Sequence, residues 1–352
     1  MIDFKKYEEE AVILNPLKNF EIDAQKVEVR IDPLTGFVSF VRSGRKFWSF
    51  IYNTDYDLID RIVSETRERC VFCSEKVHNS TPKFLENIVP EGRLKRNKAI
   101  LFPNLFPHKA HSAIIVLSEK HYLRLDEFSP DILFDAFMLA DDYLRRIYEK
   151  YGVEYAEIGA NYLYPSGSSI VHPHIQVMLS KFPYTLIKIY DEKSKMYFDE
   201  KGINYFETLA EIEKKINERF VGELGHVRYL CPFAPIKEDE INGIVTGKSN
   251  FLEFNEDDWR SISVGISRIL KAYHQRGLSA FNFAIYSGPL GKRLPYFSCG
   301  FKIVSRSGVQ RYPVSDTWFA NGLLFEGLVV EAPEDVAQFV KPFFSDINTI
   351  YP

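Results

Sequence analysis

Residues 171–179 (VHPHIQVML) alternate apolar and other side chains, and the second set includes two histidines and a glutamine. Successive side chains of a β-strand point to opposite faces. We therefore expect one face to carry His172, His174 and Gln176, and the other to carry an apolar stripe. The preceding segment, 164–170, is rich in glycine and serine, and its N–H groups and hydroxyls could bind phosphate oxygens. A half-exposed strand with two solvated histidines is the alternative, but three such side chains on one face favour chemistry.

The imidazoles and the amide suit transfer of a phosphorus-containing group. A neutral imidazole is a good nucleophile toward phosphorus and a good leaving group afterwards. His174 could therefore take a nucleotidyl group from an activated phosphate ester, with a covalent nucleotidyl-histidine as the intermediate. The amide of Gln176 could donate a hydrogen bond to a non-bridging phosphate oxygen. Such positioning and charge stabilisation is most of what phosphoryl-type transfer requires of a protein.

Cys70 and Cys73 form a C-x-x-C, the usual spacing for two thiolates on one metal ion. The sequence has no second C-x-x-C, so histidines or carboxylates would have to complete a site. The candidate histidines are His78, His108, His111, His121 and His172. A redox role would require a thioredoxin-like βαβ context, which the sequence does not supply. A zinc site and a pair of buried, unliganded cysteines both remain open.

Two stretches of the chain repeat the same order of elements, which indicates an internal duplication. In each, an apolar segment with prolines and a strand precede a helix, and two further strands follow it. The helices begin after the N-cap residues Ser129 and Asn255, and a glycine ends each one. A further helix is expected at 205–220. This order predicts an α+β fold with two related halves, 1–185 and 186–352, each an antiparallel sheet packed with helices.

The composition describes a chain with a large apolar core and a weak negative charge. Its 352 residues are 45% hydrophobic, and the formal net charge is −4. Nucleic-acid binding is driven by basic surface against phosphate, so we expect no DNA or RNA partner. No stretch approaches the roughly 20 apolar residues that span a bilayer, and the N-terminus lacks a signal-peptide pattern. Four cysteines do not make a disulfide scaffold. We therefore expect a cytoplasmic protein that does not bind membranes.

Several motifs, taken in order, resemble those of the galactose-1-phosphate uridylyltransferase family, a branch of the histidine-triad superfamily. The most specific is the His-Pro-His-x-Gln run at 172–176, and its combination with the C-x-x-C and His121 is more specific still. The other matching motifs are Asp32-Pro33-Leu34-Thr35-Gly36, Arg45, Phe102-Pro103-Asn104-Leu105-Phe106, Leu117-Ser118-Glu119-Lys120-His121, Asn161 and Gly167-Ser168-Ser169. The resemblance covers most of residues 30–180 and, more loosely, the rest.

The resemblance implies a role for each matched residue. His174 would become nucleotidylated, and Gln176 would bind the transferred phosphate. One structural zinc ion would be held by Cys70, Cys73, His121 and His172. The phosphate site would be lined by Asn161, Ser168 and Ser169, and the nucleotide would be bound by Arg45 and Asn104. Two tandem histidine-triad-like halves and a homodimer are also implied.

Two departures from the family pattern bear on the reaction. Ile175 stands where family members often have glycine. The second half reads Phe297-Ser298-Cys299-Gly300-Phe301 where bacterial uridylyltransferases carry a His-x-His pair. No second metal site is therefore expected, and the second half looks like a degenerate copy.

The activity that the resemblance implies is nucleotidyl transfer from a nucleoside diphosphate sugar to a sugar 1-phosphate, by a ping-pong route. Transfer to inorganic phosphate, as in a sugar-nucleotide phosphorylase, and transfer to water are alternatives. A non-catalytic, zinc-stabilised nucleotide-binding protein is a further one.

Overall fold

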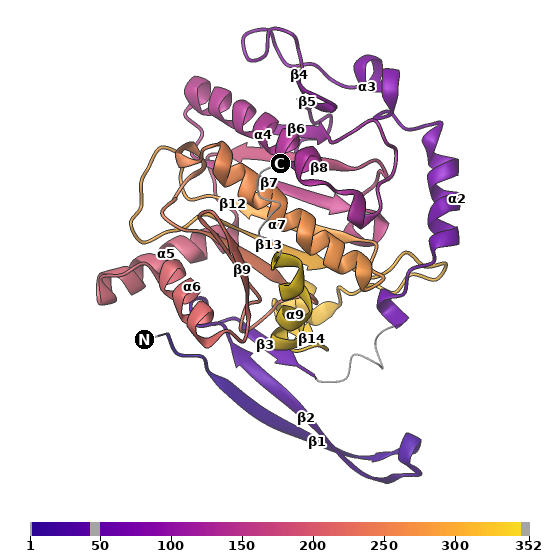
Figure 1. Cartoon of the computed structure of the whole chain (residues 1–352), viewed down its shortest axis with the longest axis vertical. Coiled ribbons are helices and arrows are strands. Elements are labelled where there is room, and N and C mark those ends of the chain that lie inside the picture. Colours follow the sequence, from indigo (N-terminus) through magenta and orange to yellow (C-terminus); the bar gives the residue numbers. More distant parts are fainter. Residues whose placement is uncertain (1, 43–49, 346–352) are drawn as a thin grey trace.

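The computed structural model describes residues 2–42 and 50–345, and most strands join in one ten-stranded sheet (Figure 1). The first half of the chain contributes β4 (Leu94–Arg96), β5 (Ala99–Pro103), β6 (His111–Val116), β7 (Tyr155–Tyr162) and β8 (His174–Ser180). The second half contributes β9 (Phe220–Leu224), β10 (Val227–Leu230), β11 (Ile241–Val245), β12 (Phe281–Tyr286) and β13 (Gly300–Ser305). All pairings in this sheet are antiparallel.

The strand order is the same in both halves. Read from the outer edge inward, it is β4-β5-β6-β8-β7 in the first half and β9-β10-β11-β13-β12 in the second. The fourth strand of each half, β7 or β12, therefore lies at the centre, and these two strands pair with each other. The α+β class is confirmed, and the two halves contribute sheets that join edge to edge. The division of the chain at residue 185 stays a prediction.

Helices α4 (Pro130–Tyr151) and α7 (Glu256–Gln275) cover one face of the sheet and pack against each other (Figure 1). Their N-termini are capped as expected, since the side chains of Ser129 and Asn255 each accept a backbone N–H from the first turn. Gly152 ends α4 with a φ of 60°, a left-handed conformation that favours glycine. Each helix buries an apolar stripe in the main hydrophobic core.

Alternation along the strands gives the sheet two different faces. In β8, the side chains of Ile175, Val177 and Leu179 are buried in the core on the side of α4. His174 and Gln176 point to the opposite side and are half-buried. We call this second side the open face.

The remaining elements surround the large sheet. A smaller sheet has the order β1-β2-β3-β14, with β14 parallel to β3 and the other pairs antiparallel. Its strands are β1 (Lys6–Asn15), β2 (Glu21–Ile31), β3 (Val38–Val41) and β14 (Gly327–Val329). The other helices are α2 (Tyr56–Arg67), α3 (Ser74–Ser80), α5 (Thr185–Lys201), α6 (Tyr205–Ile216), α8 (Phe319–Leu324) and α9 (Pro333–Val340). Short 3-10 helices lie at Pro16–Lys18, Leu125–Glu127, Tyr164–Ser166, Phe251–Glu253 and Lys341–Phe344.

Two of these elements relate to the sequence expectations. Helix α6 confirms the helix expected at 205–220. The long β1–β2 hairpin, which projects from the body of the molecule (Figure 1), was not anticipated. Among the described residues, none of the helices combines the length and the apolar composition that a membrane span requires.

Candidate active site and metal centre

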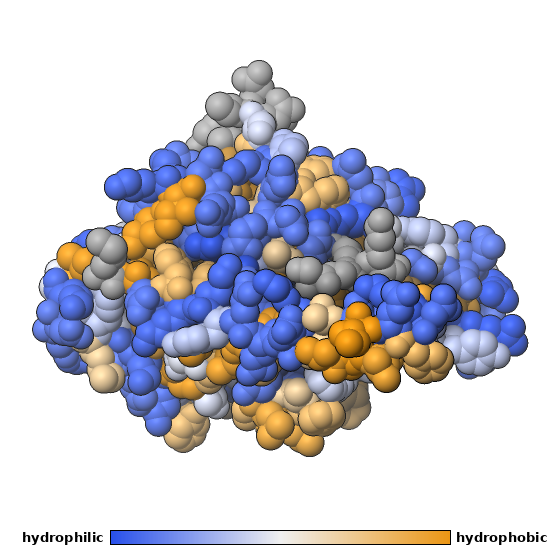
Figure 2. Space-filling model, turned by 90° about the horizontal axis from the view of Figure 1, so that it is seen from below, coloured by the Kyte–Doolittle hydropathy of each residue, from blue (hydrophilic) through white to orange (hydrophobic). Residues whose placement is uncertain are grey.

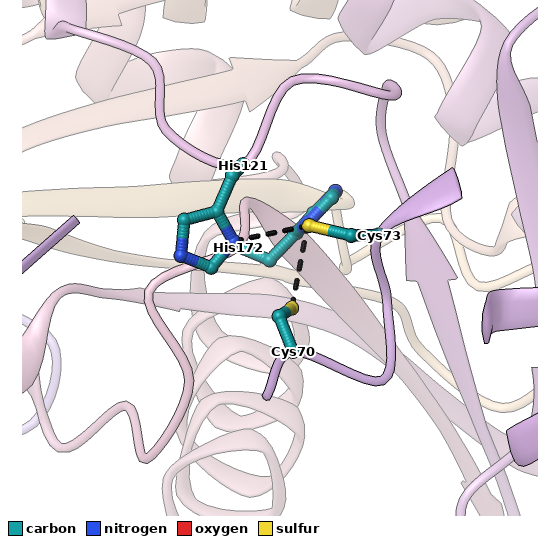
Figure 3. A group of neighbouring side chains, drawn as sticks. All are labelled: Cys70, Cys73, His121 and His172. Atoms are coloured by element: carbon teal, nitrogen blue, oxygen red, sulfur yellow. Dashed lines mark hydrogen bonds between the residues drawn. The ribbon is translucent and has the colours of Figure 1, made fainter. Parts of the chain in front are cut away.

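Four predicted metal ligands lie together, with their side chains pointing toward one another (Figure 3). The sulfur atoms of Cys70 and Cys73 and one ring nitrogen each of His121 and His172 all lie within 4.8 Å of one another. Cys73 Sγ is 3.2 Å from His121 Nδ1 and 3.4 Å from His172 Nδ1. Cys70 Sγ is 3.7 Å from His172 Nδ1. Metal–ligand bonds of about 2.0–2.3 Å at tetrahedral angles place neighbouring ligand atoms roughly 3.5 Å apart, so this donor set fits a zinc ion.

Hydrogen bonds fix both histidines with Nδ1 directed at the cysteines. His172 Nε2 is 2.8 Å from the carbonyl oxygen of Ser118, which can only accept, so Nε2 carries the proton and Nδ1 keeps its lone pair. His121 Nε2 is 3.0 Å from Thr66 Oγ1, whose own hydrogen is donated to the carbonyl of Ile62. Such outer partners set the tautomer of metal-binding histidines. Burial lowers the pKa of His172 to about 4, which keeps the ring neutral.

The cluster forms where a turn meets the ends of two paired strands. Cys70 and Cys73 lie between α2 and α3, and the N–H of Cys73 donates to the carbonyl of Cys70. His121 follows β6 and His172 precedes β8, and these strands pair with each other. Burial and the neighbouring Cys70 raise the pKa of the Cys73 thiol to about 12. A cation bound beside Cys73 would favour the thiolate form.

The structure corrects the expectation that His172 shares a face with His174 and Gln176. Strand β8 begins only at His174, because Pro173 has no N–H to donate to a ladder. His172 lies in the irregular segment before the strand, where it is 0% exposed. Its side chain turns toward the cysteines, which leaves one imidazole on the open face instead of two.

His174 is held so that its Nε2 is available for reaction. Its Nδ1 is 2.8 Å from the carbonyl oxygen of His172, so Nδ1 carries the proton and Nε2 keeps its lone pair. Desolvation lowers the pKa of His174, which favours the neutral, nucleophilic ring. The ring of Phe72 packs edge-on against it, with 5.4 Å between the ring centroids. Phe72 stands between the two cysteines in the sequence, so the turn that carries them and His174 are in direct contact.

Gln176 and Asn161 lie beside His174 on the open face. Gln176 is opposite Gly159, the last residue of β7 in the ladder with β8. Asn161 is two residues further along β7, so its side chain is on the same face as Gln176. Gly159 contributes no side chain to this face of the sheet. Asn161 Oδ1 accepts a hydrogen bond of 2.6 Å from Nδ2 of Asn282, a residue of the second half.

The other predicted substrate-binding residues are placed less directly. Ser168 is buried, and its hydroxyl donates to a carbonyl of its own turn at 2.7 Å. Ser169 is exposed. Asn104 follows the end of β5, and its side-chain oxygen accepts a backbone N–H of the same loop at 3.0 Å. Arg45 lies outside the described residues.

Phe72, which packs against His174, also lines a cavity of about 590 Å³. Lys95 adds a positive charge to its wall, whereas the charge of Lys98 is matched by Glu119 at 3.0 Å. The sequence analysis did not single out Phe72 or Lys95. The position of Phe72 inside the C-x-x-C was the one available signal for it.

The second half presents different chemistry at the matching place. A row of paired residues crosses the centre of the sheet in the order Gln176, Gly159, Ala284 and Lys302. Gly159 and Ala284 form the central pair of this row. Lys302 is next to Ala284 just as Gln176 is next to Gly159, so Lys302 occupies the position in the second half that matches Gln176. It forms a buried ion pair with Glu240 at 2.7 Å and lines a mainly apolar cavity of about 430 Å³. His174 and the Cys70–Cys73–His121–His172 cluster belong to the first half, so the candidate active site lies there.

A curated protein matches the chain over nearly its whole length. This uncharacterized protein of Archaeoglobus fulgidus is 32% identical over 348 residues, which are 98% of this chain and 100% of the relative. No protein-family model matches the chain.

Solved structures of known proteins share the fold at low sequence identity. A GalT-like protein from Arabidopsis thaliana has a TM-score of 0.68 and 20% identity, and the match covers 89% of this chain and 98% of that one. An ADP-glucose phosphorylase from the same organism, solved with bound ADP-glucose, has a TM-score of 0.68 and 20% identity over 90% of this chain and 98% of that one. A uridylyltransferase has a TM-score of 0.62 and 15% identity over 72% of this chain and 87% of that one.

These matches bear out, at the level of the fold, the resemblance drawn from the sequence motifs. The chain belongs to one family with the Archaeoglobus fulgidus protein, and its fold is that of the GalT-like proteins and uridylyltransferases.

Proposed function

We propose that this protein transfers a nucleotidyl group from a nucleoside diphosphate sugar to a phosphate-bearing acceptor, through a covalent intermediate on His174. The observation that carries the proposal is the state of this imidazole. Its Nδ1–H is used by the carbonyl of His172, its ring is kept neutral by burial, and its Nε2 is left with a lone pair beside Gln176. A nucleophile for phosphorus needs these features.

The reaction would proceed in two displacements at the same phosphorus. His174 Nε2 attacks the α-phosphorus of the donor, the P–N bond forms, and the P–O bond to the sugar 1-phosphate breaks. An oxygen of the acceptor then attacks the phosphorus, and the P–N bond breaks. The hydrogen bond from Nδ1–H to the carbonyl of His172 stabilises the positive charge that the ring gains in the intermediate. The Gln176 amide can donate to a non-bridging oxygen of the same phosphate.

The metal centre has a structural role in this scheme. The ligand set of Cys70, Cys73, His121 and His172 would hold one zinc ion, which supplies no open position for a reacting group when all four ligands are bound. Fixing His172 also fixes the carbonyl that orients His174. Metal binding is thereby coupled to the geometry of the nucleophile.

The acceptor defines two versions of the proposal. A sugar 1-phosphate would make the protein a uridylyltransferase-like enzyme, and inorganic phosphate would make it a phosphorylase. The ADP-glucose phosphorylase matches this fold as well as the GalT-like protein does, which favours testing both acceptors equally. Release of the nucleotide to water, or nucleotide binding without turnover, is the outcome expected if neither acceptor is used.

Covalent labelling tests the proposal directly. Incubation with UDP-glucose or ADP-glucose, without acceptor, should give a protein that carries one nucleotidyl group by intact mass spectrometry. His174→Ala should abolish the adduct, and the matched control His226→Ala should retain it, because His226 lies in the second half beside Asp258. Absence of an adduct with both donors, or an adduct in His174→Ala, would contradict the proposal. Adding galactose 1-phosphate, glucose 1-phosphate or phosphate to the isolated adduct then identifies the acceptor.

We further propose that the protein is a homodimer. The tip of the β1–β2 hairpin carries a group of exposed large apolar side chains: Val12, Leu14, Leu17, Phe20 and Ile22. Figure 2 shows apolar residues gathered in patches on this side of the molecule. Exposed apolar patches on a projecting hairpin favour a protein partner. Sedimentation should give twice the mass of the chain, and replacing Leu17 and Phe20 by serine should shift the mass to that of the monomer.

A further inference from the structure

The two halves of the molecule meet beside the nucleophile through a pair of asparagines. Asn161 of β7 and Asn282 of β12 stand opposite each other in the ladder that joins the halves. Both are half-buried on the open face, and Asn161 lies two residues beyond Gly159, which is opposite Gln176 at the end of the ladder with β8. The hydrogen bond between the two side chains therefore connects the second half to the site of the first.

The orientation of both amides follows from the partners of Asn282. Arg306 Nη1 donates to Asn282 Oδ1 at 2.6 Å, and a guanidinium can only donate. The amide nitrogen of Asn282 must then face the other way, where it donates to Asn161 Oδ1 at 2.6 Å and to the carbonyl of Ser166 at 3.0 Å. A carbonyl can only accept, so the second contact independently supports this assignment. Asn161 consequently turns its oxygen toward Asn282 and its NH₂ group away from it.

Arg306 is itself held rigidly. Its guanidinium makes two hydrogen bonds with Asp316, from Nε at 2.7 Å and from Nη2 at 2.5 Å. The side chains of Arg306 and Asp316 are only 14% and 5% exposed. The N–H of Ser307 also donates to Asp316 at 3.1 Å. Such a bidentate pair fixes the direction of the remaining guanidinium donors, including the one that reaches Asn282.

We propose that Asn282 is a positioning residue for the transfer reaction. Held by Arg306, it fixes the Asn161 amide so that the NH₂ group, and not the oxygen, faces the phosphate bound at His174. The second half, which has no nucleophile at the matching place, thereby orients the side-chain amide of Asn161 in the first half. This inference rests on the proposed function, since it assigns the phosphate of the donor as the group that Asn161 meets.

The isosteric substitution Asn282→Asp separates orientation from simple loss of a contact. A carboxylate at this position keeps the pair with Arg306 but can no longer donate to Asn161. The Asn161 amide would then turn its NH₂ toward the carboxylate and present its oxygen to the phosphate. Asn282→Ala leaves the amide free to turn either way. We expect adduct formation in single-turnover experiments to slow about a hundredfold in Asn282→Asp and about tenfold or less in Asn282→Ala.

A background without the Asn161 amide provides the control. In Asn161→Ala, the Asp and Ala substitutions of Asn282 should give the same rate of adduct formation, because no amide remains to be oriented. A slower rate for Asp in this background would show that its negative charge acts on the phosphate directly, and would overturn the inference. Equal rates for Asn282→Asp and Asn282→Ala in the wild-type background would overturn it too. Zinc content and melting temperature confirm that each variant is folded.

A second readout keeps this inference separate from the proposed function. The side-chain amide resonance of Asn161 is identified by its loss in Asn161→Ala. Adding UMP or AMP should shift this resonance in the wild type and leave it unshifted in Asn282→Asp. If the wild type forms no adduct but shows the shift, the proposed reaction fails while the orientation by Asn282 stands. If neither nucleotide shifts the resonance in the wild type, the inference is overturned.

Discussion

Glu157 is a buried carboxyl on the open face. It precedes Gly159, the residue opposite Gln176, by two positions in β7. It is opposite Met178 and Tyr286 in the two ladders of its strand, and its side chain is 9% exposed. One of its carboxylate oxygens, Oε2, has no hydrogen-bond partner among the described residues. Desolvation raises the pKa of Glu157 to about 7, although the nearby charge of Lys109 opposes this.

This carboxyl predicts a pH-dependent stability. Because the pKa of Glu157 is higher in the folded state than in the unfolded one, its contribution to stability is present below about pH 4.5 and is lost as pH rises through 7. Glu157→Gln removes the ionisation. From pH 5 to pH 8, the free energy of unfolding of the wild type should fall relative to the variant by up to about 3 kcal/mol. Urea denaturation at both pH values measures it.

Glu211→Gln, on an exposed position of α6, is the matched control for this change. It should track the wild type at both pH values. A wild type and a Glu157→Gln variant with the same pH dependence would show that the carboxyl is hydrated and has an ordinary pKa.

For single residues, the sequence indicated which side chains belong to the candidate site better than it indicated their hydrogen bonds in the folded protein. The residue pattern singled out His174, Gln176 and the C-x-x-C, and the family resemblance supplied His121 and His172 as the remaining metal ligands. It could not reveal that Ser168 is engaged in its own turn, since that depends on local backbone geometry. Nor could it reveal Asn282, which reaches Asn161 only through the pairing of two distant strands.

The α2–α3 connection is the element on which the metal site depends. Its turn supplies two cysteines, and between them Phe72 touches His174. The other two ligands come from the segment after β6 and the segment before β8. A metal ion would therefore tie a connection between helices to the part of the sheet that carries His174.

Removing one ligand should disconnect this element. We expect Cys70→Ser to lose zinc by elemental analysis, to melt at a lower temperature, and to form the nucleotidyl adduct about 10–100 times more slowly. Cys231→Ser, a change at a buried cysteine outside the cluster, should retain about one zinc per chain. A Cys70→Ser variant with full zinc content and an unchanged rate would refute both the ligand set and its structural role.

The elements that were predicted well are those with complete local signals. The two long helices have N-caps, apolar stripes and glycine stops, and both form as expected. Strand β8 begins at His174, directly after Pro173, which has no N–H to donate to a ladder, so the alternation that included His172 extended the strand too far. The β1–β2 hairpin was missed because its apolar residues lie exposed at the tip, so they follow no core-facing pattern.

In the whole molecule, the two halves share a sheet and a pair of packed helices. Trp259 of α7 is 1% exposed, and its Nε1 donates to Asp141 of α4 at 3.2 Å. Asp141 also accepts from Arg145 of its own helix at 2.7 Å. The sequence showed the repeat, but single-sequence patterns carry no information about which strand edges of two repeats will pair. The continuity of the sheet is therefore a result of the structure alone.

This joint predicts cooperative unfolding of the two halves. Asp141→Ala leaves the Trp259 N–H buried without a partner, which should lower the free energy of unfolding by about 1–3 kcal/mol in a single transition. Asp142→Ala is the matched control, because Asp142 makes the same kind of ion pair with Arg146 but faces solvent and not α7. Its cost should stay below about 1 kcal/mol. Two separate transitions in either variant would indicate that the halves unfold independently.

The repeated strand order has an evolutionary consequence. Two identical half-length chains that paired through their fourth strands would build the same ten-stranded sheet around a two-fold axis, with two identical sites. In such a dimer every substitution occurs twice. Once both copies are encoded in one chain, the position of Gln176 and the matching position of Lys302 can change separately. One copy can then keep the reactive groups under purifying selection, while the other is free to acquire residues that serve its neighbour.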